Sequence, residues 1–114
     1  MSFPQRGEVY WVQLDPAVGS EIAKTRPAIV ISNNIGNQYA DRVIVAPISS
    51  GSVDKIYPFE VRLNAGDGGL AQVSKVLLDQ IRTVDKSRLG NRIGGLTAVR
   101  MEEINRAIKL SLAV

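Results

Sequence analysis

The sequence predicts a small, mainly β domain of mostly antiparallel strands with a single C-terminal helix. Several short stretches are rich in β-branched and aliphatic residues, and Gly, Asn, Asp and Pro separate them at short intervals, as is typical of strands joined by turns. Only the last stretch repeats its apolar residues at helical spacing. A chain of 114 residues has the size of one ordinary domain. We therefore expect one domain over residues 1–114, either a barrel or an α+β fold.

Three strands are expected in the first half of the chain. Glu8–Leu14 reads E-V-Y-W-V-Q-L, and Ala28–Ser32 and Val43–Ile48 are almost wholly aliphatic, which favours extended structure. The first two are joined by a loop over Pro16–Thr25. Asn33–Arg42 is dense in Asn, Gly and Asp, so we expect a loop there with room for one helical turn.

Further strands are expected in the second half. Phe59–Leu63 reads F-E-V-R-L, and this alternation indicates a strand with one solvent-exposed face. Asn64–Gly69, N-A-G-D-G-G, is a turn. Val76–Asp79 and Gln80–Val84 then form either one long bent strand or two short ones.

Two helical segments follow. Asp85–Leu89 is expected to form a single helical turn that Gly90 ends. Thr97 is a suitable N-cap for a longer amphipathic helix. The apolar residues of that helix recur at spacings of three and four, and they are Met101, Ile104, Ile108 and Leu112.

The composition excludes several kinds of site. There are no cysteines and no histidines, so a disulfide scaffold, a thiolate nucleophile and a cysteine zinc site are excluded. The side chain best suited to proton transfer near neutral pH is also missing. The net charge of +3 is compatible with a polyanionic partner. Neither a signal peptide nor a stretch of membrane-spanning length is visible, so we expect a cytoplasmic protein.

An ordered set of motifs resembles a known toxin family. R-G-E-V-Y-W, L-D-P-A-V-G-S-E, R-P-A-I-V-I-S-N, I-G-N, V-I-V-A-P-I-S and L-D-Q-I-R-T-V-D-K-S-R-L follow one another without large gaps. In this order they resemble the MazF/PemK (Kid) family of toxin endoribonucleases, the mRNA interferases. No single motif is diagnostic, but the set covers the chain from Arg6 to the terminal helix.

The resemblance implies a fold, an activity and partners. The fold would be a CcdB/MazF-like, SH3-like barrel with an added helix, working as a homodimer. The activity would be sequence-specific cleavage of single-stranded RNA in a type II toxin–antitoxin system, with no metal and no cofactor. A cognate MazE-like antitoxin would cover the RNA groove with a flexible tail and would bind DNA together with the toxin. No membrane is involved.

The resemblance also implies a catalytic pair. The arginine of the R-P segment is Arg26, and the threonine that closes the V-A-x-I-T strand of the family is replaced here by Ser49. Serine keeps the hydroxyl but lacks the methyl group that restricts the rotamer of threonine. We expect activity to survive this change.

RNA cleavage without a metal ion uses the ribose 2′-hydroxyl as the nucleophile. Arg26 fits stabilisation of the phosphorane charge, because the guanidinium fork matches phosphate oxygens. Ser49 can donate a hydrogen bond to a phosphate oxygen or orient the 2′-hydroxyl. Glu21 is the candidate proton acceptor, or a ligand for a base edge. By residue type alone, each has an ordinary structural reading as a loop or turn residue.

Further residues are candidates for RNA binding. If Asp79–Val84 is a strand, Gln80 and Arg82 share one face and could contact base edges or phosphates, although a half-exposed polar face is an equally good reading. Base stacking would depend on Trp11 or Tyr57. Lys86, Arg88 and Arg92 form, with Arg82, a cationic cluster that is either a solvated face or a track for the RNA backbone. The complete candidate set for RNA binding is Ser20, Thr25, Ser50, Pro58, Gln80 and Arg82.

Two other functions stay open. A CcdB-like protein of the same fold would bind DNA gyrase and have no enzymatic activity. Such a protein does not require Arg26 before a proline together with a hydroxyl at position 49. The serine at that position also leaves room for an inactive barrel that only binds RNA or an acidic peptide.

Overall fold

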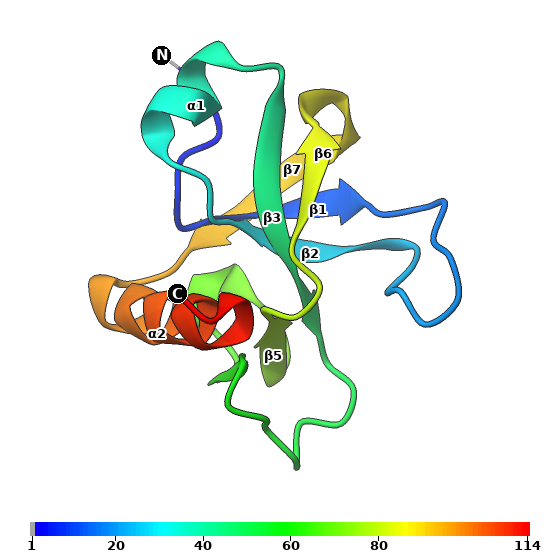
Figure 1. Cartoon of the computed structure of the whole chain (residues 1–114), viewed down its shortest axis with the longest axis vertical. Coiled ribbons are helices and arrows are strands. Elements are labelled where there is room, and N and C mark those ends of the chain that lie inside the picture. Colours follow the sequence, from blue (N-terminus) through cyan, green and yellow to red (C-terminus); the bar gives the residue numbers. More distant parts are fainter. Residues whose placement is uncertain (1) are drawn as a thin grey trace.

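A computed structural model describes residues 2–114. It is a mostly antiparallel β structure with a C-terminal helix packed on one side (Figure 1), so the predicted fold class is confirmed. The elements, in chain order, are β1 (Glu8–Gln13), β2 (Thr25–Val30), α1 (Asn34–Tyr39), β3 (Arg42–Ser49), β4 (Glu60–Leu63), the 3-10 turn η1 (Asp67–Gly69), β5 (Ser74–Leu77), β6 (Arg82–Asp85), the 3-10 turn η2 (Lys86–Arg88), β7 (Leu89–Gly95) and α2 (Ala98–Leu112).

The sheet is organised around β3. Its strands follow the order β4-β5-β3-β2-β1-β7, and β6 pairs separately with β3. The first half of β3 pairs with β6, its middle residues 45–47 pair with β2, and its last two residues pair with β5. Figure 1 shows β3 as a long strand through the middle of the molecule, with β6 beside one half and β5 beside the other. A single strand therefore joins the two parts of the sheet.

The core is divided into two clusters by the alternation of side chains along β1 and β2. Val9 and Ile29 point to the side that α2 covers, where Ile104 is fully buried. Val12 and Ala28 point to the other side and pack with residues of β3 and β6. Arg26 and Pro27, near the start of β2, belong to neither cluster.

The expectation that the last helix begins at Thr97 is confirmed, because Thr97 Oγ1 accepts a hydrogen bond from the Arg100 amide at 3.3 Å. Met101, Ile104 and Ile108 face the core as predicted. Leu112 does not, and it is 56% exposed. No helix among residues 2–114 is long and apolar enough to span a membrane.

β7 is the element that the sequence does not predict. The expected helical turn before Gly90 is present as η2, with Asp85 as its N-cap. We assigned no element to the residues that follow it, but Leu89–Gly95 forms a strand that pairs with β1. In this segment a glycine can be required by close packing and not by a turn. A Cβ atom on Gly94 would lie 2.4 Å from the carbonyl oxygen of Gly68 in η1.

One strand boundary differs from the prediction, and two alternatives that the sequence left open are decided. β2 starts at Thr25, so Arg26 belongs to the strand and not to the loop before it. Asn33–Arg42 contains the short helix α1, capped by the Asn33 side chain, which accepts from the Gly36 amide at 2.8 Å. β5 and β6 are two separate short strands, and Gln80 lies in the bend between them.

Candidate active site

Arg26 is held in the sheet by its backbone and in the adjacent loop by its side chain. It pairs with Val12 of β1, and its Nε donates a hydrogen bond to the carbonyl oxygen of Ala23 at 2.8 Å. Pro27 restricts Arg26 to extended conformations. Within residues 2–114, its two terminal amino groups have neither a hydrogen-bond partner nor a carboxylate in contact. The guanidinium therefore presents its forked end to solvent while its stem is fixed.

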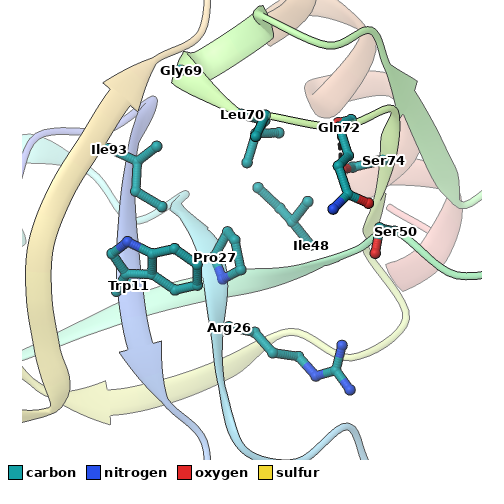
Figure 2. A pocket seen from close by; sticks show the side chains of 11 residues that line it. Trp11, Arg26, Pro27, Ile48, Ser50, Gly69, Leu70, Gln72, Ser74 and Ile93 are labelled. Carbon is teal, nitrogen blue, oxygen red and sulfur yellow. Dashed lines mark hydrogen bonds between the residues drawn. The ribbon is translucent and has the colours of Figure 1, made fainter.

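A cavity of about 250 Å³ lies beside Arg26. Figure 2 shows Trp11 and Pro27 next to each other on one wall, and Gln72 and Ser50 across the cavity from Trp11. The Arg26 guanidinium extends away from the apolar wall on the side toward which the Ser50 hydroxyl points. The full lining is Trp11, Arg26, Pro27, Ile48, Ser50, Gly69, Leu70, Ala71, Gln72, Ser74 and Ile93. An apolar cavity with a few polar groups and one cation at its edge suits a flat, hydrogen-bonding ligand beside an anion.

Ser49 and Ser50 close β3 and have different surroundings. Ser50 lines the cavity, whereas Ser49 does not. Ser49 pairs with Lys75 of β5, and its Oγ accepts a hydrogen bond from the Gly51 amide at 3.1 Å. Ala28 lies opposite Pro47 at the end of the β2–β3 ladder. Arg26 and Ser49 each lie two residues beyond this pair, and two residues along a strand return a side chain to the same face. Residues opposite each other share a face of the sheet, which brings this predicted pair to one face.

A second cavity of about 430 Å³ adjoins the β1–β2 loop. It is lined by Glu21, Ile22, Asp79, Gln80, Ile81, Arg82 and Thr83. Glu21 is thus in a different cavity from Arg26, and its Oε1 accepts a hydrogen bond from the Val18 amide at 2.7 Å. The two cavities are linked through the loop, because the Ala23 carbonyl binds Arg26.

Gln80 and Arg82 both bind the backbone of that loop. Gln80 Oε1 accepts from the Ile22 amide at 2.7 Å, and an Arg82 amino group donates to the Leu14 carbonyl at 2.9 Å. Our expectation that they lie on one strand is wrong, since only Arg82 belongs to β6. They nevertheless meet at one cavity, and their first role is to fix the β1–β2 loop.

The remaining candidate residues are spread around this area. Ser20 and Thr25 are exposed at the β1–β2 loop and the start of β2, and Pro58 is exposed in the β3–β4 loop. Trp11 is 44% exposed and lines the first cavity, so its ring is accessible from there. Tyr57 is equally exposed, but its ring already stacks on Phe59 with centroids 5.6 Å apart.

The cationic cluster is partly engaged within the protein. Arg92 Nε lies 2.8 Å from Glu8 Oε2, and an Arg88 amino group donates to the Gln13 carbonyl at 3.1 Å. Burial raises the pKa of the Glu8 carboxyl, but hydrogen bonds from the Gln5 amide, the Tyr10 hydroxyl and Arg92 hold that pKa below its usual value. Burial and the bond to Glu8 raise the pKa of Tyr10 to about 12. Arg92 is therefore better explained as the partner of Glu8 in an ion pair than as a ligand of the RNA backbone.

Several residues that line the first cavity were not candidates from the sequence, among them Leu70, Gln72 and Ile93. Ile93 was missed because β7 was missed, and the other two lie in a segment with no regular pattern. Across the part of the chain that the structure describes, no group of three or more acidic side chains could hold a metal ion.

Comparison with known proteins gives consistent results. The model of the family described as PemK-like, MazF-like toxin of type II toxin–antitoxin systems matches residues 5–112. The chain is 40% identical over 110 residues to endoribonuclease EndoA of Bacillus subtilis, covering 96% of this chain and 95% of the relative. It is 40% identical over 113 residues to endoribonuclease MazF9 of Mycobacterium tuberculosis, covering 95% of each chain.

Solved structures agree with the sequence relatives. The crystal structure of MazF from Deinococcus radiodurans superposes with a TM-score of 0.84 at 30% identity and full coverage of both chains. A mycobacterial endoribonuclease in complex with its cognate antitoxin superposes with a TM-score of 0.81 at 27% identity, covering 97% of this chain and 96% of the other.

Proposed function

The chain belongs to the PemK-like, MazF-like toxin family of type II toxin–antitoxin systems, and on that premise we propose how this endoribonuclease cuts RNA. The substrate is single-stranded RNA, and the 2′-hydroxyl of one ribose attacks the adjacent phosphorus. The bond from phosphorus to the 5′-oxygen breaks, leaving a 2′,3′-cyclic phosphate and a 5′-hydroxyl. No metal ion takes part. The observation that carries this proposal is the fixed Arg26 side chain with its unpaired terminal amino groups beside the cavity.

Arg26 stabilises the charge that develops on the non-bridging oxygens. Its guanidinium has two free amino groups in one plane and a stem fixed by Ala23 and Pro27, which is the geometry of a preorganised phosphate ligand. It is not the base, because an arginine keeps its proton at all ordinary pH values. Ser49, on the same face by register, donates to a phosphate oxygen or orients the 2′-hydroxyl.

The proton of the 2′-hydroxyl passes to an acceptor, and the 5′-oxygen gains one as it leaves. Glu21 is the candidate acceptor, and its place in the second cavity means that the ribose would have to lie near the loop that joins the two cavities. Glu21→Gln tests this role directly. Full cleavage with an unchanged pH profile in that variant would remove Glu21 from the mechanism.

The cavities and the groups between them form the proposed RNA site. Ser50 and Trp11 contact RNA at the first cavity, Gln80 and Arg82 at the second, and Ser20, Thr25 and Pro58 from the neighbouring loops. The endoribonucleases among the relatives support RNA cleavage over a CcdB-like action on gyrase. A MazE-like antitoxin is the proposed partner, because a structural neighbour is a complex with its cognate antitoxin. We propose further that the protein is one domain, acts as a homodimer and works in the cytoplasm.

The decisive experiment incubates the purified protein with a long RNA in excess EDTA and maps the cut ends. We expect discrete cuts that leave a 2′,3′-cyclic phosphate on one fragment and a 5′-hydroxyl on the other. Cleavage that EDTA abolishes, or ends with a 5′-phosphate, would refute the proposed chemistry. Absence of all cleavage with and without added divalent ions would refute the activity itself.

A further inference from the structure

A buried ion pair joins β4 and β5 beside the candidate site. Lys75 Nζ lies 3.0 Å from Glu60 Oε1, and the two side chains are only 8% and 7% exposed. Such a pair seldom stabilises a fold more than apolar side chains of the same size would, because both charges lose their hydration. Stability alone therefore does not explain a charged pair at this position.

Both side chains also bind the backbone of the β3–β4 loop, residues 50–59. Lys75 Nζ donates to the carbonyl oxygen of Lys55 at 3.3 Å. Glu60 Oε1 accepts from the Tyr57 amide at 3.0 Å. Lys75 Nζ also lies 6.0 Å from the centre of the Tyr57 ring, which stacks on Phe59. The ion pair thus fixes the middle of a loop that has no strand or α-helix of its own.

This loop starts at the candidate site. Its first residue, Ser50, lines the cavity beside Arg26. Ser49, directly before it, pairs with Lys75 in the β3–β5 ladder. The residue that binds the middle of the loop is therefore the direct cross-strand neighbour of the candidate catalytic serine. The path of the chain after Ser49 depends on where Lys75 and Glu60 hold residues 55–57.

We infer that Lys75 and Glu60 are positioning residues that hold the β3–β4 loop in its RNA-binding conformation and so determine KM and the choice of cut site. The inference rests on the proposed function. Both groups are buried, so neither touches the reacting atoms. A loop that is already ordered loses less conformational freedom when RNA binds. Removing its anchors should weaken binding and relax the choice of cut site, with little change in the chemical step.

The test replaces both charges with apolar residues, in the double variant Glu60→Leu/Lys75→Met. No buried charge is left unpaired, so the fold should be retained, while both backbone anchors of the loop are lost. Against a short RNA that contains the preferred cut site, KM should rise about three- to tenfold, because more loop side chains must be ordered on binding. We expect kcat to change by less than about twofold. On a long RNA, new cut sites should appear, and the Tyr57 amide should exchange its hydrogen faster.

Two single variants serve as controls. Glu60→Gln keeps an acceptor for the Tyr57 amide, and its KM should stay closer to the wild-type value than that of the double variant. Val43→Ala weakens the other core cluster, near the start of β3 and at the opposite end of that strand from the loop, and should leave KM and the cut map unchanged. If the wild-type protein cuts RNA and a folded double variant has the wild-type KM and cut map, the inference is overturned and the proposed function stands. A wild-type protein that does not cut would instead overturn the proposed function.

Discussion

Replacing Arg26 by alanine should separate stability from activity. The side chain makes one hydrogen bond, from Nε to the Ala23 carbonyl, so its loss should lower the free energy of unfolding by about 1–2 kcal/mol. No buried carboxylate is left unpaired, because Arg26 takes part in none of the ion pairs formed by residues 2–114. Removing a preorganised donor to a developing oxyanion typically costs about 10²–10³ in kcat, or roughly 3–4 kcal/mol. The loss in activity should therefore exceed the loss in stability.

The assay measures kcat on a short RNA at saturating concentration, with urea unfolding of the same protein samples. Arg26→Lys should recover little, because an ammonium group cannot present the planar fork. Arg106→Ala is the matched control, since Arg106 is exposed on α2 and its removal changes the net charge by the same amount. If folded Arg26→Ala keeps more than about a tenth of the wild-type kcat, the activation free energy has risen by less than about 1.4 kcal/mol. The assigned role of Arg26 would then be wrong.

Three further outcomes are expected. Gly94→Ala should lower the free energy of unfolding in urea by about 1–3 kcal/mol, because its Cβ would lie 2.4 Å from the Gly68 carbonyl oxygen. Gly36→Ala in α1 is the control: its Cβ meets only ordinary contacts, and the free energy of unfolding should rise by about 0.5–1 kcal/mol. The pKa of Tyr10 is raised to about 12 in the folded protein, above the ordinary value near 10. The contribution of the protonated Tyr10 to stability is therefore complete below about pH 10 and is lost as pH rises from about 10 to 12. Over that range, the free energy of unfolding in urea should fall less steeply for Tyr10→Phe than for the wild-type protein. Gln80→Leu removes the acceptor for the Ile22 amide in the β1–β2 loop. Amide hydrogen exchange in that loop should accelerate, and RNA cleavage should become slower. Unchanged exchange would contradict the anchoring role of Gln80.

The elements that the sequence predicted correctly are those with a local signal. Thr97 followed by apolar residues at helical spacing is such a signal, and so is the aliphatic run after Pro27. The β7 segment L-G-N-R-I-G-G has the opposite signal, because glycines usually indicate turns. Here, Gly94 is required by the close approach of η1, which is a tertiary contact that no local pattern shows.

The same distinction applies to the site. Arg26 was predicted from its position before a proline and from the family resemblance, and the structure shows how its side chain is fixed. The pairing of Lys75 with Glu60 could not be predicted, because it depends on the register of β4 and β5, in which Glu60 lies opposite Leu77. Gln80 was predicted from its residue type, but its bond to the Ile22 amide depends on a loop whose path the sequence does not define.

The pairing of β1 with β7 has a consequence for how the protein is made. Trp11 on β1 and Ile93 on β7 form walls of the same cavity, although more than eighty residues of synthesis separate them. β1 cannot pair with β7 until the ribosome has synthesised both strands, so the cavity cannot form before then. A nascent chain that still lacks β7 has no complete cavity at the candidate site. The topology thus delays the assembly of this cavity until β7 has been synthesised.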